Sequence, residues 1–167
     1  LLRPVGGLER SVRPDSLVVE IRQLAAFGDV VLGGKLADIV AVHVLGIPCD
    51  LDAIRDICDE HDVLLIEDSC ESVGSLYKGR MTGSFGIAGS FSFFFGHHIS
   101  TIEGGMVCTD DDELYEILKS VRCHGWDRDL SEDYQARLRV DHNIDDFRAL
   151  YTFYWQGYNL RSTDLQA

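Results

Sequence analysis

Short hydrophobic runs begin near residue 38 and are separated by polar, helix-like stretches. Ile39–Val44 is an apolar run interrupted only by His43, and Val63–Ile66 is a second run, so both have the character of buried strands. Between them, Asp50 can cap a helix whose apolar residues share one face, namely Leu51, Ile54, Ile57 and Cys58. Strand, helix and strand in this order predict a βαβ unit with two parallel, neighbouring strands.

The pattern continues with an aromatic strand and a second amphipathic helix. Ser90–Phe95 and Met106–Thr109 are predicted as strands. Thr109 or Asp110 can cap a following helix whose inward residues are Leu114, Ile117, Leu118 and Val121. After Gly125 the chain is polar and aromatic, and the pattern predicts no further element there.

The first 36 residues are poorly patterned, apart from one amphipathic helix expected over Ser16–Phe27. Residues 37–167 are predicted to form an α/β structure with a largely parallel sheet. The chain has no initiator methionine, so we expect it to start inside a longer protein.

Composition and charge exclude several classes of partner. The formal net charge is −13, which weighs against nucleic acid because phosphates require a basic face. No apolar run is long enough to span a bilayer, so no membrane partner is expected. Five cysteines without a C-x-x-C spacing indicate reduced thiols and favour the cytoplasm. No metal-ligand spacing occurs either, so we expect no metal site.

A group of carboxylates follows the second buried strand. Glu67 and Asp68 lie at its carboxyl end, where ligands of open α/β sheets bind, and Glu71 follows three residues later. Asp68 can serve as a general base, as a metal ligand or as the partner of a cofactor cation. It can equally serve only as a cap for the next segment.

The aromatic strand ends in hydroxyls and histidines. Alternation places Ser90, Ser92 and Phe94 on one face, and a hydroxyl at such a strand end suits a phosphate. His97 and His98 are adjacent and point in opposite directions in an extended chain, so they form a poor chelating pair. Taken alone, they fit structural or surface histidines equally well.

Taken together, these segments resemble the DegT/DnrJ/EryC1/StrS sugar aminotransferase family. The resemblance covers about Asp38 to Ala167 and is carried by six ordered blocks, which are His43-Val44-Leu45-Gly46, Ile66-Glu67-Asp68, Gly83-Ser84-Phe85-Gly86, Phe91-Ser92-Phe93, Glu103-Gly104-Gly105-Met106 and Gly157-Tyr158-Asn159-Leu160-Arg161 with Thr163-Asp164-Leu165-Gln166-Ala167. It implies the large domain of the PLP-dependent aspartate aminotransferase fold (fold type I). That domain would be incomplete here, with its N-terminal part and the small C-terminal domain missing.

The resemblance also assigns roles to individual residues around pyridoxal 5'-phosphate (PLP). Asp68 matches the acid that binds the pyridine nitrogen, and Glu71 stands where the family commonly has glutamine near the ring hydroxyl. Ser92 matches the serine that binds the cofactor phosphate. Asn159 matches an asparagine that reaches the phosphate across a homodimer interface, so the resemblance implies a shared active site.

One position departs from the family pattern. Aminotransferases of the family have the lysine that binds PLP covalently just after the stretch F-S-F-Y-P-[TS], and here that position is His97. The three lysines of the chain lie elsewhere: Lys35 in the poorly patterned start, Lys78 in a predicted turn and Lys119 on a predicted helix. An imidazole cannot form the covalent link of an amine, but it can move a proton near neutral pH.

A branch of the family that removes the C3 hydroxyl of 4-keto-6-deoxy nucleotide sugars has histidine at this position. Glu71 and the run from His97 to Met106 look most like the branch that acts on GDP-4-keto-6-deoxy-D-mannose. This resemblance implies a PLP/PMP-dependent 3-dehydratase with His97 as catalytic base and L-glutamate as amino donor. No cysteine follows Cys123, which favours the type without an iron–sulfur cluster. An aminotransferase of the same family and an inactive fragment are the alternatives.

Overall fold

The βαβ unit predicted from the sequence is present in the structure, a computed structural model that describes residues 38–164. Strand β1 (Asp38–Val42) and strand β2 (Leu64–Asp68) are parallel and are joined by helix α2 (Leu51–His61). Asp50 caps α2 as predicted, because its carboxylate accepts the N–H of Ala53 at 3.4 Å. β1 is shorter than predicted, since Val44–Gly46 forms a 3-10 turn, η2, after the strand has ended.

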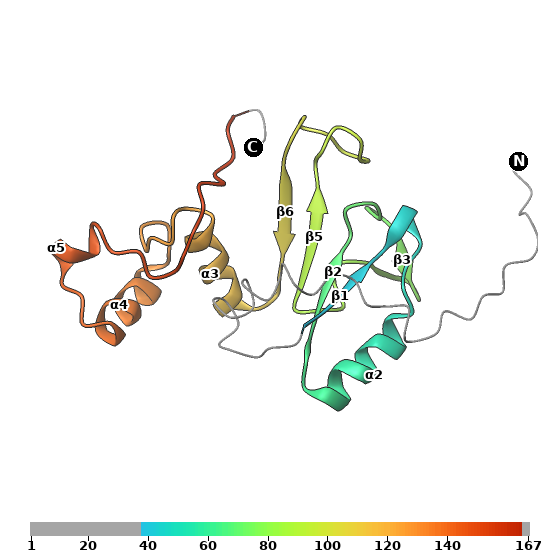
Figure 1. Cartoon of the computed structure of the whole chain (residues 1–167), viewed down its shortest axis with the longest axis horizontal. Coiled ribbons are helices and arrows are strands. Elements are labelled where there is room, and N and C mark those ends of the chain that lie inside the picture. The colour runs from blue at the N-terminus through green and yellow to red at the C-terminus, as the bar shows by residue number, and fades with distance from the viewer. Residues whose placement is uncertain (1–37, 165–167) are drawn as a thin grey trace, which may run out of the picture.

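The main sheet has four strands in the order β1-β2-β5-β6 (Figure 1). β5 (Ala88–Ser92) is parallel to β2, and β6 (Gly105–Cys108) is antiparallel to β5. Three strands therefore confirm the predicted parallel sheet and β6 is the exception. A separate small hairpin pairs β3 (Leu76–Tyr77) with β4 (Arg80–Met81).

The predicted strand Ser90–Phe95 begins two residues earlier and ends at Ser92. The prediction is wrong for residues 93–95, because the chain beyond Ser92 forms a hairpin arm that leads back to β6. Phe93 N donates to Gly104 O at 2.9 Å, and Phe95 N donates to Ile102 O at 3.1 Å. The loop that carries His97 is thus held at the end of this arm.

The two faces of the sheet have different cover. One face packs against α2 in a core made of Ala41, Leu51, Ile54, Cys58 and Leu65. Because side chains alternate along each strand, Glu67 shares this covered face with Leu65, and Asp68 points to the opposite face. The side chain of Asp68 is accordingly not part of the packing under α2.

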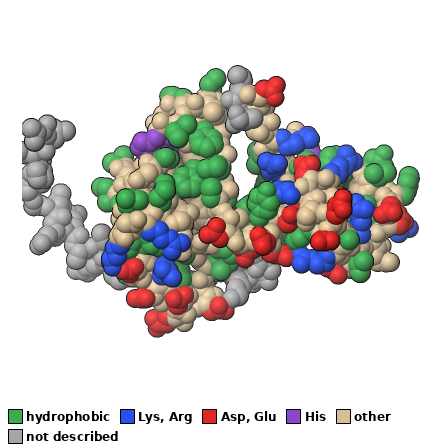
Figure 2. Space-filling model, turned by 180° about the vertical axis from the view of Figure 1, so that it is seen from behind, with side chains coloured by type: hydrophobic (Ala, Val, Ile, Leu, Met, Phe, Trp, Pro, Cys, Tyr) green, Lys and Arg blue, Asp and Glu red, His purple; other side chains and the backbone are tan. Residues whose placement is uncertain are grey.

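A second core joins the sheet to the C-terminal helices. Its buried residues are Ala88, Leu114, Ile117, Val121, Leu130, Tyr134 and Leu138. Helix α3 (Asp112–Val121) lies between the sheet and helices α4 (Glu132–Asp141) and α5 (Asp146–Ala149), which the sequence pattern did not predict (Figure 1). Seen from behind, acidic and basic side chains intermingle over this part, whereas apolar side chains form a broad area over the sheet part (Figure 2).

The N-terminal cap of α3 corrects one prediction. Asp111 is the cap, since its carboxylate accepts the N–H of Leu114 at 2.7 Å. Thr109, one of the two expected caps, instead donates its hydroxyl to Ile87 O at 2.7 Å and so ties the end of β6 to the start of β5.

Two sequence-based expectations, the helix over Ser16–Phe27 and the placement of Lys35, lie outside the described residues. Within residues 38–164, no helix is both long and apolar enough to cross a membrane. The same part of the chain contains no group of three or more histidine, cysteine or acidic side chains able to hold a metal ion. All five cysteines are free thiols.

Candidate functional site

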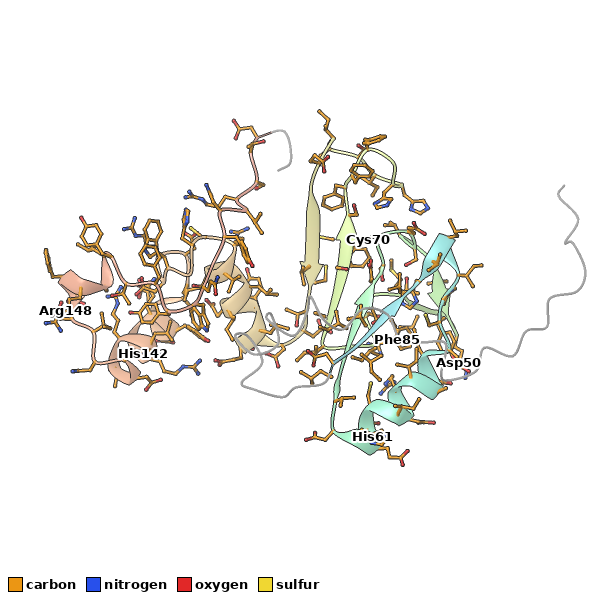
Figure 3. All side chains as sticks on the ribbon, viewed as in Figure 1. Asp50, His61, Cys70, Phe85, His142 and Arg148 are labelled. Atoms are coloured by element: carbon orange, nitrogen blue, oxygen red, sulfur yellow. The ribbon has the colours of Figure 1, made fainter. Side chains whose placement is uncertain are left out.

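Asp68 ends β2 and is oriented by the backbone that follows it. Its Oδ1 accepts the N–H of Cys70 at 3.0 Å, and Asp68 is in register with Ser90 on β5. Cys70 lies beside the ends of β2 and β5, with its Sγ 4.0 Å from Ser90 Oγ (Figure 3). Burial, together with the Asp68 carboxylate, raises the pKa of the Cys70 thiol to about 11, so the thiol stays neutral beside the acid near pH 7.

Ser92 lies at the end of β5, two residues beyond Ser90. Because register partners and residues two apart share a face, Ser92 is on the same face as Asp68. Its Oγ accepts the N–H of Phe94 at 3.1 Å, which leaves the hydroxyl hydrogen available to donate to a ligand. The structure therefore brings the predicted ring-binding acid and the predicted phosphate-binding hydroxyl to the ends of adjacent parallel strands.

His97 is fixed by Phe94. Its backbone N–H donates to Phe94 O at 3.0 Å, and its ring makes an edge contact with the Phe94 ring at 5.7 Å between centroids. The Nδ1 atom is buried and has no hydrogen-bond partner among the described residues. A buried imidazole nitrogen without a partner is costly and marks a place where a ligand would complete the hydrogen bonding.

Glu71 is held from the neighbouring strand end. Its Oε2 accepts the N–H of Leu45 at 2.7 Å, and Leu45 lies in the turn η2 that follows β1. The same turn is fixed again by Ser75, whose hydroxyl donates to Gly46 O at 2.9 Å. Glu71 thus extends the row of polar groups across the ends of β1, β2 and β5.

Asn159 is placed away from this row by its contacts. It forms a β-bridge with Cys123, just beyond α3, and its Oδ1 accepts from Arg161 Nε at 3.2 Å. The side chain is exposed. The described residues therefore bring Asp68, Glu71, Ser92 and the His97 loop to one end of the sheet, and Asn159 is not joined to them.

Sequence reasoning missed a buried pair next to the site. His43 Nε2 lies 3.0 Å from Glu67 Oε2, and both side chains are fully buried. The backbone N–H of Gly83 also donates to Oε2 at 2.7 Å, while Phe85 and Gly86 donate to Oε1 at 2.5 and 2.9 Å. The only signal in the sequence was a histidine inside a buried apolar run.

The protonation of this pair follows from its contacts. Burial raises the pKa of Glu67, but the bonds from His43 and the three backbone N–H groups outweigh it and hold the pKa below its ordinary value. Burial lowers the pKa of His43, but contacts with Cys49 and Glu67 outweigh burial and raise the pKa to about 9. The hydrogen bond from the Cys49 backbone opposes protonation and decides the assignment. His43 Nδ1 accepts the backbone N–H of Cys49 at 3.1 Å. A proton on Nδ1 would point at this N–H, and two donors would then face each other without an acceptor. We therefore assign the neutral imidazole with its hydrogen on Nε2.

The donor set at the strand ends fits PLP. A carboxylate at Asp68 suits a protonated ring nitrogen, and the free hydroxyl hydrogen of Ser92 suits a phosphate. The described lysines are engaged elsewhere: Lys78, in the β3–β4 turn, pairs with Asp52, and Lys119 on α3 pairs with Glu116 at 3.3 Å. Neither lysine is positioned to bind a cofactor at the strand ends.

Known proteins with related sequences include two sugar 3-dehydratases. The chain is 44% identical over 131 residues to the GDP-4-keto-6-deoxy-D-mannose 3-dehydratase of Yersinia pseudotuberculosis, which covers 78% of the chain and 33% of the relative. It is 42% identical over 137 residues to the dTDP-4-dehydro-2,6-dideoxy-D-glucose 3-dehydratase of Saccharopolyspora spinosa, which covers 77% and 29%. The chain thus spans about a third of the length of these relatives.

Solved structures of related enzymes have the same fold. An Escherichia coli GDP-4-keto-6-deoxy-D-mannose 3-dehydratase with bound hydrated PLP superposes with a TM-score of 0.63 at 34% identity, covering 84% of this chain and 35% of the other. These likenesses confirm the PLP-dependent aminotransferase-like fold class. Residues 23–167 match the DegT/DnrJ/EryC1/StrS aminotransferase family, and the chain belongs to that family.

Proposed function

We propose that the chain is the central part of a PLP/PMP-dependent 3-dehydratase that removes the C3 hydroxyl of a nucleotide-linked 4-keto-6-deoxy hexose. The observation that carries this proposal is the imidazole of His97 at the lysine position, with a buried Nδ1 that has no hydrogen-bond partner within residues 38–164. GDP-4-keto-6-deoxy-D-mannose is the substrate we favour, because it is named in the Yersinia and Escherichia coli relatives. L-glutamate is the proposed amino donor.

In this proposal the strand ends hold the cofactor. Asp68 keeps the pyridine nitrogen protonated by charge pairing, and Ser92 donates its hydroxyl hydrogen to the phosphate. Glu71, which follows β2 and is anchored on Leu45 beyond the end of β1, would lie near the ring hydroxyl. When bound, PMP supplies the amine that reacts with the C4 ketone and the ring that accepts electrons.

His97 moves the protons of the reaction. A neutral imidazole accepts a proton at one nitrogen and, once charged, delivers it to the departing C3 oxygen, which leaves as water. In the net reaction, glutamate and the 3-hydroxy-4-keto sugar yield 2-oxoglutarate, ammonia and the 3-deoxy-4-keto sugar. Without a lysine amine at position 97, the protein does not recapture the cofactor covalently.

We further propose a homodimer in which Asn159 reaches the phosphate of the partner's site. The exposed side chain of Asn159, whose contacts tie it to the end of α3, supports this arrangement. We assign residues 37–167 to an incomplete large domain and residues 1–36 to a separate N-terminal segment. The five free thiols support a cytoplasmic location. No iron–sulfur cluster is proposed.

Product analysis of a hybrid enzyme tests the proposed activity. In this hybrid, residues 38–164 replace the matching third of the Yersinia relative. Given glutamate and GDP-4-keto-6-deoxy-D-mannose, it should release ammonia and a 3-deoxy sugar, identified by NMR. A stable 4-amino sugar that keeps its C3 hydroxyl would favour the aminotransferase alternative, which related proteins named GDP-perosamine synthase make the second candidate.

A further inference from the structure

We infer that His43 and Glu67 form a buried positioning pair for Asp68, which sets the direction of the Asp68 carboxylate without touching a ligand. This inference rests on the proposed role of Asp68 as the ring-nitrogen partner. Both side chains are on the face of the sheet opposite to Asp68 and are fully buried, so neither can contact a cofactor there.

His43 holds both residues of the Glu67–Asp68 pair. Its backbone N–H donates to Asp68 O at 3.0 Å, while its ring donates to Glu67 Oε2 at 3.0 Å. The ring is itself fixed from behind by the N–H of Cys49. A shift of β1 against β2 would therefore break a bond to each of two consecutive residues.

Glu67 in turn fixes the loop that supports the end of β5. Its carboxylate accepts all three N–H groups that the loop provides at Gly83, Phe85 and Gly86. This loop packs directly under β5, because a Cβ on Gly83 would lie 2.6 Å from the Phe91 ring and a Cβ on Gly89 would lie 2.2 Å from Gly83 O. Phe85 itself lies between the sheet and α2 (Figure 3).

Three of the six family blocks thus converge on one carboxylate. They are His43–Gly46, Ile66–Asp68 and Gly83–Gly86, which together contain the ring donor, the acceptor and the three backbone donors. A carboxylate is required because four donors point at it, whereas a glutamine would turn its NH₂ group toward some of them. The neighbouring strand end would then lose its fixed geometry, and with it the bond between Asp68 Oδ1 and Cys70 N.

The amide of Cys70 reports on this bond and needs no cofactor. Amide hydrogen exchange is measured by NMR on the 167-residue chain without cofactor, with Ile54 N–H in α2 as the reporter of overall stability. In Glu67→Gln, exchange at Cys70 should rise on the order of tenfold or more beyond any rise at Ile54, as expected when a bond to a charged acceptor is lost. Glu116→Gln is the matched control, since Glu116 also accepts a backbone N–H and is mostly buried but lies on α3.

Two substitutions of His43 distinguish a loss of positioning from a general loss of stability. Glutamine can donate to Glu67 and accept from Cys49, as neutral histidine does, so His43→Gln should keep Cys70 protected. His43→Leu should lose the protection. Equal exchange changes at Cys70 and Ile54 in Glu67→Gln and His43→Leu would overturn the inference and leave a purely structural pair.

A second readout separates this inference from the proposed function. The protonation of the ring nitrogen of ¹⁵N-labelled PMP is followed by NMR in the hybrid enzyme. With Glu67→Gln, the pKa of the bound ring nitrogen should fall toward that of the Asp68→Asn variant, whereas His43→Gln alone should leave it unchanged. If PMP does not bind to the unsubstituted hybrid, the proposed function fails while the Cys70 result stands. If PMP binds and its nitrogen is unchanged by Glu67→Gln, the positioning role is wrong.

Discussion

Asp68 and Ser90 are register partners across the parallel strands β2 and β5, so their side chains share one face of the sheet. Ser92 lies on the same face one step further along β5, and the hairpin arm beyond it carries the His97 loop. One strand end therefore supplies an acid and its neighbour supplies a hydroxyl and an imidazole. This pairing is the structural basis for the roles proposed for Asp68, Ser92 and His97.

Replacing Asp68 by asparagine should remove charge pairing while keeping hydrogen bonding. In the hybrid enzyme, Asp68→Asn should lower turnover on the order of a hundredfold or more and weaken PMP binding much less, because the ring nitrogen loses the charge that keeps it protonated. Turnover and PMP affinity are measured side by side, with Asp59→Asn on the exposed face of α2 as control. Unchanged turnover would show that Asp68 only caps the segment after β2.

The low pKa of Glu67 predicts acid sensitivity of the fold. Its pKa is depressed in the folded state, so ionised Glu67 stabilises the fold above its ordinary value of 4.5, and that stabilisation is lost as the pH falls through the folded-state pKa. Urea unfolding of the chain between pH 7 and pH 3 should show this loss. Glu67→Gln should be less stable at pH 7 and should have a flatter profile below pH 4.5. Parallel profiles for the two proteins would contradict the assignment.

Ile102 has a strained backbone. Its φ of 73° is in the left-handed region, which costs about 1–2 kcal/mol for a residue with a branched Cβ. The side chain is 69% exposed, so little burial is lost when it is removed. Ile102→Gly should therefore stabilise the chain by about 1 kcal/mol in urea unfolding, after allowing for the extra flexibility of glycine. Ile102→Ala keeps a Cβ and should gain clearly less; an equal gain would locate the effect in the lost apolar surface.

Asp127 and Arg139 form a partly buried ion pair that connects the segment before α4 to the helix. Arg139 Nε lies 3.0 Å from Asp127 Oδ2, and Asp127 is 1% exposed. Arg139→Met should cost about 2 kcal/mol of unfolding free energy, below the ~3–5 kcal/mol of a fully buried pair because Arg139 keeps some solvent contact. Arg148→Met breaks an exposed pair with Asp145 and should cost under about 1 kcal/mol. Similar losses for both would argue against a special role of the Asp127 pair.

The sequence predicted the elements with strong local signals. Asp50 followed by apolar residues on one face was enough to place α2, and two apolar runs were enough to place β1 and β2 in parallel. The glycines before Met106 did not reveal that β6 runs antiparallel to β5, because direction depends on how the intervening arm folds back. Helix α4 was missed because only Tyr134 and Leu138 face inward, and one such pair is a weak periodic signal.

The site was only partly accessible from sequence for a related reason. Asp68 could be placed at a strand end, since the end of β2 followed from the hydrophobic pattern. Ser92 was predicted inside the strand Ser90–Phe95, and its position at the end of β5 came only from the structure. The bond between His43 and Glu67 could not be predicted from the sequence. It depends on the relative register of β1 and β2 and on how the chain turns after Val42. The loop donors to Glu67 lie sixteen to nineteen residues away along the chain and carry no polar side-chain signal of their own.

Borohydride reduction followed by mass spectrometry tests the central claim most directly, namely that His97 replaces the lysine that binds the cofactor. The hybrid enzyme is loaded with PLP, reduced, digested and mapped across residues 38–164, and a His97→Lys variant is treated in parallel. We expect no pyridoxyl adduct on this part of the unsubstituted protein and an adduct at position 97 in the variant. A stable adduct on Lys78 or Lys119 in the unsubstituted protein would contradict the account.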